Sequence, residues 1–526
     1  MQTGAADSVT TARRRRQAAG PSRPAAWAPD LSLFLAAVTL VYTLVIFDGL
    51  HKLFRDSDAG WHIRTGERIL ASGELPRTDP YSFTRAGEPW IDWEWAADVA
   101  AGAAHRAWGL RGVALLFAVA IALSTWLWVR LTWAAGGDFL LASVLAAPML
   151  STANLHWLAR PHVFGWALLV GWMWMLERGS LGSFSRFHAL AAAVFGCVWA
   201  NVHASFFLGV LTGLLYAAGS WVGGTVWEGQ VKSLKRTQGC LLAALFFSLG
   251  SLLNPYGLAL HRHVIAYLLD AELLARVAEF QTFNFHVAGA GWIVAAMGVA
   301  ALGAAAALAT RRVDRFLVIG FFVVAALRSA RGLPLMALVA LPLANAGFVE
   351  VLERAEGLNR RLRDWLDSAL EYSARLRAID RGFAGWALAP VLVALAAVGV
   401  RTAGAGFPAD QFPVAASQAV ESLPAEARIL APDSFGGYLI YRFNGARKVY
   451  FDGRSDFYGI EFMKEYLKLV EVRPGWRDVA RRYRFTHALL PVGAPLADAL
   501  RTGGWRPVYQ DDVAALLEAP GTSHGS

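Results

Sequence analysis

The stretch RDSDAGWHIRTGERIL, residues 55–70, follows directly on the first strongly hydrophobic segment of the chain. It places carboxylates, a histidine and arginines where a membrane-spanning helix would emerge into water. An amphipathic helix is expected to begin at about Ala59, and charges held at the water boundary beside such a helix are typical of an interfacial active site. The apolar side chains expected to anchor this helix among the lipid headgroups are Trp61, Ile63, Ile69 and Leu70.

The composition indicates a polytopic membrane protein. Of 526 residues, 56% are hydrophobic and only 17% are charged, and the mean hydropathy is +0.39, which is too apolar for an ordinary soluble protein. The net charge of +9 comes from short basic clusters between hydrophobic runs, which argues against a nucleic-acid partner. The two cysteines, Cys197 and Cys240, lie in or beside hydrophobic segments and suggest neither a disulfide framework nor a metal site.

Hydrophobic runs divide the chain into about 11 predicted transmembrane helices. Before them, residues 1–26 are polar and contain Arg13–Arg16, which predicts a disordered cytoplasmic tail. No small-residue cleavage site follows the first run, so we expect an uncleaved anchor. The predicted spans are 31–50, 110–132, 138–153, 161–177, 188–202, 204–223, 239–254, 288–309, 315–330, 332–349 and 384–402.

Lysines and arginines collect in alternate loops, which predicts the orientation of the chain. A cytoplasmic N-terminus puts the basic loops inside, and an odd number of spans then exports residues 403–526. We therefore expect a multi-pass protein of a bacterial inner membrane, with a transmembrane domain over residues 27–402 and a periplasmic loop over 51–109. The basic residues placed inside are Arg178, Arg186, Lys232, Lys235, Arg236, Arg311, Arg312, Arg315 and those of Arg354–Arg381, an expected amphipathic helix.

The exported region 403–526 has the pattern of a compact, soluble α/β domain. Strand-like and helix-like segments alternate in it, and its last residues, 521–526, resemble a flexible tail. The expected strands are 428–431, 448–451, 487–491, 507–510 and 513–518, and the expected helices are 461–470 and 477–483.

Unusual polar residues within and beside the spans all fall on the predicted external face. A charged side chain at the bilayer centre costs roughly 2.5 to 3.5 kcal/mol on insertion scales, so such residues usually face a polar cavity. One shared cavity would explain them all. We predict Asp58 and Asp56 as catalytic, and as substrate-binding His62, Arg64, Glu94, Arg160, His162, Asn201, His203, Arg328 and Arg331.

Each of these residues also has a purely structural interpretation. Asp56 or Asp58 could be the N-cap of the following helix, and Asp92 could cap the next one, because Asp accepts hydrogen bonds from free backbone N–H groups there. The arginines could be interfacial residues whose charge reaches the headgroups. Asn201 and His203 could serve helix packing. Convergence of carboxylates, histidines and arginines on one face favours a site.

The order of parts resembles the GT-C superfamily of membrane glycosyltransferases, which take sugars from polyprenyl-phosphate donors. Residues 58–73, DAGWHIRTGERILASG, resemble the aspartate, amphipathic helix and terminal glycine of the lipid A aminoarabinose and protein mannosyltransferase branch. The resemblance places Asp58 at the catalytic aspartate. That branch often has Asp-Glu, whereas Ala59 follows Asp58 here.

The chain is also similar to a group of functionally unassigned bacterial membrane proteins. The shared elements are DxDxGWHxRTGE, DPYSFT, RPH, WANVH, NPYG, GGYL and FDGR, at residues 56–67, 79–84, 160–162, 199–203, 254–257, 436–439 and 451–454.

These patterns lead to the hypothesis of an inverting transferase that moves a sugar from polyprenyl phosphate to a hydroxyl of a glycan, lipid or protein acceptor. Asp58 would accept the proton, and arginines would neutralise the lipid phosphate. The chemistry requires no cofactor and no metal. The alternative is a transporter or a lipid-handling or assembly scaffold whose cavity binds a headgroup. We also expect residues 433–438 and 452–458 of the α/β domain to form loops over the crevice.

Overall fold

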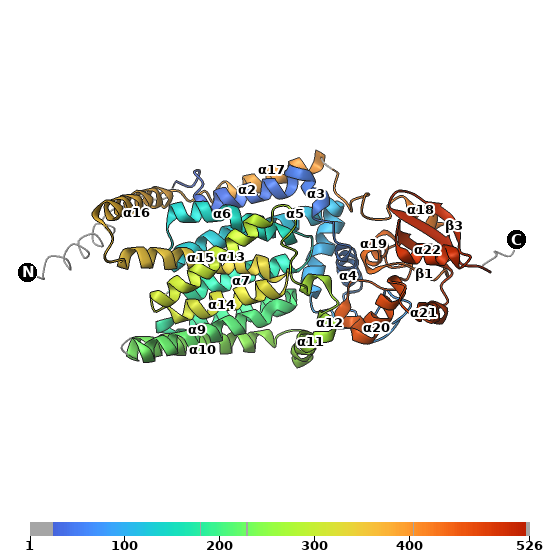
Figure 1. Ribbon diagram of the computed structural model, residues 1–526, viewed down its shortest axis with the longest axis horizontal. Helices are drawn as coiled ribbons and strands as arrows, with labels where there is room; N and C mark the ends of the chain where they lie inside the picture. The colour runs from blue at the N-terminus through green and yellow to red at the C-terminus, as the bar shows by residue number, and fades with distance from the viewer. Residues whose placement is uncertain (1–24, 179, 228–229, 403, 522–526) are drawn as a thin grey trace, which may run out of the picture.

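The computed structural model describes residues 25–178, 180–227, 230–402 and 404–521. A helical bundle forms most of the molecule, and a smaller domain with a sheet lies at one end of it (Figure 1). Most of the predicted N-terminal tail and residues 522–526 lie outside the described residues.

Each of the eleven predicted spans coincides with a helix. These helices are α2 (Leu31–Val45), α5 (Trp95–Ala135), α6 (Phe139–Ala153), α7 (His162–Glu177), α8 (Arg186–Val202), α9 (Phe207–Val226), α10 (Gln230–Ser251), α13 (Ala290–Ala309), α14 (Val313–Arg328), α15 (Gly332–Arg354) and α17 (Ala389–Thr402). Five of them, namely α5, α6, α9, α13 and α15, are long and apolar enough to cross a membrane, counting the short 3-10 turns that adjoin α6 and α9. Eleven crossings therefore remain a prediction.

Further helices lie between the predicted spans. They are α3 (Gly49–Lys52), α4 (Asp58–Ser72), α11 (Leu258–Leu269), α12 (Ala271–Leu274) and α16 (Arg360–Asp380). The expected helix near Asp92 is the first part of α5, which continues through a kink at Trp108 and Gly109 into the predicted span. Gly109 adopts a φ of 59° at the kink, a conformation that glycine takes without steric cost.

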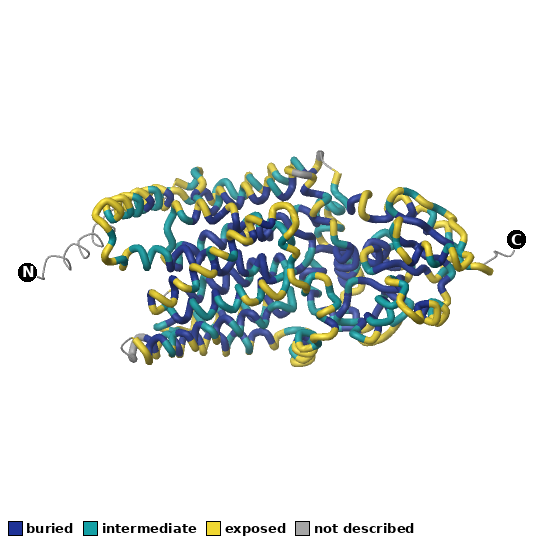
Figure 2. The backbone as a smooth tube through the Cα atoms, in the orientation of Figure 1, coloured by how far each residue is buried: buried dark blue, intermediate teal, exposed yellow. Residues whose placement is uncertain are grey.

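Helix α4 begins at Asp58, as expected, and ends at Gly73 with a left-handed φ of 72°. Its predicted place among lipid headgroups is wrong for Trp61, Ile63 and Ile69, which are buried inside the protein. The helix lies between the bundle and the smaller domain (Figure 2); its first six residues are all buried, whereas its last turn is exposed.

Two glycines explain why α4 is buried. A Cβ on Gly60 would overlap the backbone of Gly437, and a Cβ on Gly66 would overlap the backbone of Asp98 in α5. Residues without side chains at these two points let the backbones of neighbouring helices approach closely. The helix is therefore held between two parts of the protein.

The smaller domain contains one sheet in the order β1-β2-β4-β3. Strand β1 (Ile429–Leu430) is parallel to β2 (His487–Pro491), whereas β4 (Ala514–Glu518) is antiparallel to both β2 and β3 (Arg506–Gln510). Its helices are α18 (Ala416–Glu421), α19 (Asp433–Arg442), α20 (Ser455–Val470), α21 (Trp476–Tyr483) and α22 (Pro495–Thr502).

Two predictions for this domain were wrong. Residues 433–438 lie in helix α19 and not in a loop, and residues 448–451 do not belong to the sheet. The backbone N–H of Val449 donates to Tyr81 at 3.0 Å, and that of Phe83 donates to Val449 at 3.1 Å. The strand-like pattern at 448–451 therefore pairs with the loop 51–109 and joins the domain to the bundle.

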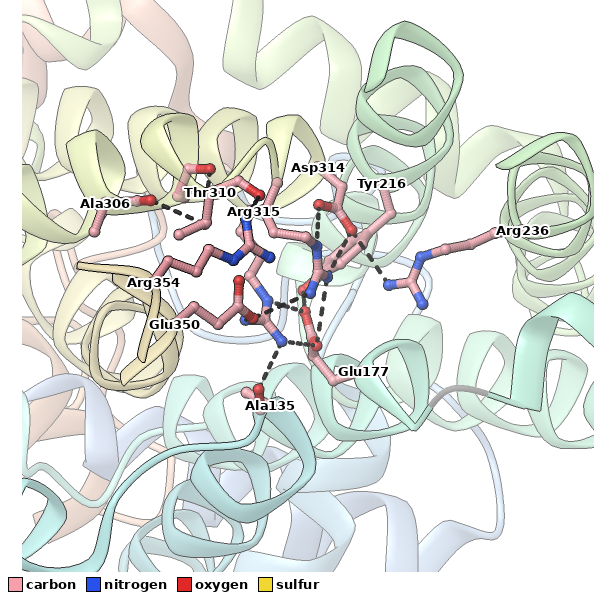
Figure 3. Close-up of polar contacts among 12 residues, drawn as sticks. Ala135, Glu177, Tyr216, Arg236, Ala306, Thr310, Asp314, Arg315, Glu350 and Arg354 are labelled. Carbon is pink, nitrogen blue, oxygen red and sulfur yellow. Dashed lines mark hydrogen bonds and ion pairs between the residues drawn. The ribbon is translucent and has the colours of Figure 1, made fainter. Parts of the chain in front are cut away.

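At the bundle end remote from this domain, five charged residues form what we call the closed cluster (Figure 3): Glu177, Asp314 and Arg315, which are buried, and Arg312 and Glu350, which are partly buried. Arg315 bonds Glu177 at 2.8 Å, Glu350 at 3.0 Å and the carbonyl of Ala135 at 2.7 Å. Arg312 bonds Asp314 at 2.9 Å. These contacts tie together the ends of α5, α7, α14 and α15.

Candidate active site

A cavity of about 340 Å³ lies at the bundle end that faces the α/β domain. One part of its wall is apolar and comes from α9, α11, α14 and α15, including Phe207, Leu268, Phe321 and Leu335. Another part is strongly polar. Seven residues predicted for the site contribute to this wall: Asp58, Glu94, Arg160, His162, His203, Arg328 and Arg331.

Arg160 organises the carboxylates of the polar wall. It precedes Pro161, whose fixed φ suits the start of α7. Its two terminal nitrogens reach Asp56 at 2.7 Å and Asp58 at 2.9 Å, and the nitrogen that bonds Asp56 also lies 2.7 Å from Glu279. One guanidinium therefore meets three carboxylates, two from the start of α4 and one from the segment before α13.

Asp58 stands in the first turn of α4 and directs its carboxylate toward Arg160. Burial raises the pKa of Asp58 to about 7. Arg160 opposes this rise, and the negative charges of Asp56 and Asp452 add to it. The side chain is therefore able to take up a proton near neutral pH.

Asp56 behaves differently. Burial alone would raise its pKa, but Arg160 and the backbone N–H of Asp58 hold the pKa of Asp56 below its usual range. That N–H donates to the carboxylate of Asp56 at 2.9 Å. Among the described contacts, Asp56 is thus the carboxylate that bonds a free N–H at the start of α4, whereas Asp58 is directed into the cavity.

A chain of carboxylates and imidazoles leads from the cavity wall, at His203 and Glu94, into the protein. Glu94 is 3.2 Å from Nε2 of His203 and 3.6 Å from Nε2 of His62, and Nδ1 of His62 is 2.6 Å from Asp98. Burial, strengthened by the charge of Asp92 and opposed by that of Arg160, raises the pKa of Glu94 to about 8. Glu94, which lines the cavity, can therefore hold a proton near neutral pH.

Two more arginines lie on the wall near its apolar part. Arg331 pairs with Glu279 and stacks over the ring of Phe280 at 4.8 Å. Arg328 is exposed and has no hydrogen bond or ion pair within the described part of the chain. An unpaired guanidinium beside an apolar wall is suited to the phosphate of an amphipathic ligand.

Comparisons with known proteins bear on the fold. The Archaeoglobus fulgidus oligosaccharyltransferase, solved with a tethered acceptor peptide, aligns with a TM-score of 0.53 at 11% identity, over 88% of this chain and 68% of that one. Its apo form gives 0.51 at 12% identity. Both are GT-C glycosyltransferases. The chain has the GT-C fold.

Other comparisons add less. ArnT from Cupriavidus metallidurans, also a GT-C protein, aligns with a TM-score of 0.39 at 15% identity, over 92% of this chain and 97% of that one. No family model matches the chain, and no curated protein matches it either.

Four of the predicted residues do not line the cavity of this GT-C fold. Asp56 lies behind Arg160, and His62 lies behind Glu94. Asn201 accepts from the indole of Trp95 at 2.8 Å and serves helix contacts. Arg64 instead contacts the α/β domain: it donates to the carbonyl of Tyr441 at 2.9 Å and stacks over the ring of that residue at 4.4 Å.

The α/β domain contributes residues 453–456 to the cavity wall. A Cβ on Gly453 would overlap the carboxylate of Asp58, so only glycine fits there without a shift. Arg454 is buried and bonds Asp452 at 2.7 Å and Asp79 at 2.8 Å, which anchors the segment to the loop 51–109. The expected segment 452–458 is therefore in contact with the crevice, but only its first part is a loop, because residues 455–458 begin helix α20. The FDGR motif supplies its buried anchor.

Sequence reasoning missed the partners of this segment on α11. Nε2 of His263 lies 3.0 Å from Asp456, and the hydroxyl of Tyr267 lies 3.0 Å from that of Ser455. Both pairs close the cavity between α11 and α20. No local pattern marks α11 as a wall of the site, because its partners lie nearly two hundred residues further along the chain. Within the described residues, no group of three His, Cys, Asp or Glu side chains is arranged to hold a metal ion.

Proposed function

We propose that the protein is an inverting glycosyltransferase, active at the periplasmic face of a bacterial inner membrane, which moves a sugar from polyprenyl phosphate to an acceptor hydroxyl. The observation that carries the proposal is the placement of Asp58, a buried carboxylate with a pKa of about 7, on the wall of a cavity whose lining also includes four arginines, three of them predicted for the site. The GT-C fold supports it, since that fold is the one found in membrane glycosyltransferases.

The reaction is a single displacement. The acceptor oxygen bonds to the anomeric carbon as the bond from that carbon to the phosphate oxygen breaks, and the electron pair of the broken bond leaves with the lipid phosphate. Asp58 takes the proton of the acceptor hydroxyl, which it must approach to about 2.6 to 3.2 Å. Attack opposite the leaving group inverts the anomeric configuration.

The arginines assist departure of the phosphate. Negative charge builds on the leaving oxygen, and charge-assisted hydrogen bonds from guanidinium groups stabilise it. Arg328 has no competing partner among the described residues, so it is our first candidate, followed by Arg331. Arg160 has a different role: it keeps Asp56 ionised and fixes the orientation of Asp58. His162 and His203 contribute polar contacts to the sugar.

The shape of the site also supports a lipid-linked donor. The apolar residues Leu268, Phe321 and Phe322 stand on the same wall as Arg328, so a phosphate and the start of a hydrocarbon chain can be bound together. The acceptor is a hydroxyl of a glycan, lipid or protein. A transporter would be expected to hold its ligand near the membrane midplane, whereas this cavity lies at one end of the bundle.

Mass spectrometry of lipid-linked sugars and envelope glycans in a deletion strain tests the proposal. We expect one polyprenyl-phosphate sugar to accumulate and one glycan modification to disappear. Wild-type protein should restore both, whereas Asp58→Asn at matched level should restore neither. Unchanged glycans and lipid-linked sugars in the deletion strain would contradict the proposed function.

A further inference from the structure

Helix α16 stands apart from the site and has no part in the proposed reaction. It lies at the bundle end opposite the α/β domain (Figure 1). Its inner face is docked: the hydroxyl of Ser373 accepts from the backbone of Phe139 at 3.1 Å and of Leu140 at 3.2 Å, and Asp380 accepts from the backbone of Leu31 at 2.6 Å. These donors are the first residues of α6 and α2, so α16 is fixed at the start of two helices of the bundle.

The outer face of α16 carries a stripe of uncovered apolar side chains. Trp365 is 65% exposed, Tyr372 52% and Ile379 59%. Their spacing of seven residues places all three on one side of the helix. Trp386, in the turn before α17, is 70% exposed. Large aromatic side chains of this kind are enriched where a membrane meets water.

Unpaired cations accompany this stripe: by the helical period Arg361 and Arg375 lie beside it, whereas Arg360 lies on the far side of α16 and Arg381 follows its last residue. Arg360, Arg361, Arg375 and Arg381 are exposed, and none has an ion pair or hydrogen bond to another part of the chain that the structure describes. Of the acids on α16, Asp367 and Asp380 are already paired with Arg363 and Arg377. The other two acidic side chains, Asp364 and Glu371, are outnumbered by the four unpaired arginines, so α16 and its C-cap carry an excess of positive charge.

We propose that α16 is an anionic-lipid-binding helix, which lays its apolar stripe among the acyl chains and its free arginines against the headgroups of negatively charged phospholipids. An apolar stripe bordered by arginines is the pattern of an interfacial helix, and its affinity for a membrane rises with the negative charge of the surface. Charge complementarity identifies the partner as an anionic leaflet. The inference is independent of the proposed transfer reaction.

The experiment uses the full chain in nanodiscs, with a nitroxide label on Tyr372→Cys in a Cys197→Ser background. Accessibility of the label to oxygen and to a water-soluble nickel complex is measured in phosphatidylcholine alone and with added phosphatidylglycerol. We expect the anionic lipid to shield the label from nickel and to raise its access to oxygen. Changing Arg360, Arg361, Arg375 and Arg381 to Gln should abolish that difference between the two lipids.

A matched variant controls for the loss of four charges. Arg477, Arg481, Arg482 and Arg484 are exposed on the α/β domain, and changing them to Gln should leave the label shielded. A label equally shielded in both lipids would overturn recognition of anionic headgroups, and a label open to nickel in both would overturn membrane contact altogether. Spin–spin broadening that grows with the number of chains per disc would instead show that a second copy covers the stripe.

Discussion

Buried and partly buried charges gather at both ends of the bundle, but only one of the two groups lines a cavity. The closed cluster around Arg315 has contacts on every side, and none of its members contributes to the cavity wall (Figure 3). The site cluster, which we define as Asp56, Asp58, Arg160, Glu279 and Arg331, borders the cavity through every member except Asp56. Burial and ion pairing therefore do not distinguish a functional site from a structural one in this protein. The two groups differ in their access to a cavity, which only the site cluster has.

Charge balance differs between the two groups as well. In the closed cluster, Glu177 contacts both Arg312 and Arg315. In the site cluster, Arg160 must serve three carboxylates, so Asp58 receives only a share of one guanidinium. A buried carboxylate whose negative charge is only partly balanced by nearby cations has a raised proton affinity. General-base chemistry near neutral pH requires such a carboxylate.

The largest expected effect is that of Asp58→Asn on activity. The amide cannot take a proton, and general-base contributions are typically about a hundred- to ten-thousand-fold. Transfer rates should fall by that factor at matched protein level, while stability changes little because Asn keeps hydrogen bonds to Arg160. Asp56→Asn is the matched control. Full activity of the Asp58 variant would end its assignment as the base, and loss in the Asp56 variant alone would move the base two residues upstream.

A substitution in the closed cluster, at the opposite end of the bundle, should lower the stability of the protein and leave its activity unchanged. Arg315→Gln leaves Glu177 buried beside a neutral group, and breaking a buried pair in this way costs roughly 3 to 5 kcal/mol of unfolding free energy. Thermal or denaturant unfolding in detergent measures the loss, and specific activity per folded molecule should stay near the wild-type value. Arg354→Gln, at an exposed arginine nearby, should be mild. A folded Arg315 variant with strongly reduced turnover would show that the two ends are coupled.

Gly453→Ala tests how closely the α/β domain approaches the site. Because the added Cβ would overlap the carboxylate of Asp58, the carboxylate or the segment must move. A displacement of about 1 Å in a reacting group can cost about a hundredfold in rate. We expect a loss of that order in turnover with intact folding, whereas Gly493→Ala, where a Cβ would meet nothing but φ is positive, should affect folding alone. Normal turnover in Gly453→Ala would show that the domain is not needed for the alignment of Asp58.

Local patterns predicted the helices well and the crevice in part. Hydrophobic runs identified the bundle, and polar residues in or beside those runs identified seven side chains of the cavity wall. Burial of α4 was missed because its apolar face is equally suited to lipid and to protein. The role of Gly60 and Gly66 depends on partners that sequence spacing does not reveal.

Long-range contacts explain the other errors. Arg64 was expected in the substrate site because it shares a helix with Asp58, but its partner Tyr441 lies 377 residues away. Residues 448–451 have strand-like composition, yet they pair with the loop 51–109 outside the sheet. Where two separate elements meet, composition predicts the type of contact but not the partner.

The smallest expected effect, and the one that tests the contrast between Asp56 and Asp58 most directly, is the pH dependence of transfer. A base works in its ionised form, so a pKa raised to about 7 means that activity is present above pH 7 and lost as the pH falls below it. The rate at low substrate concentration should fall about tenfold for each pH unit below that point. A rate profile of the wild-type protein, measured over the range in which it stays folded, gives the midpoint. A midpoint near the usual value for an aspartate, about 3.9, would contradict the raised pKa of Asp58. Asp58 would then be ionised at neutral pH, as Asp56 is.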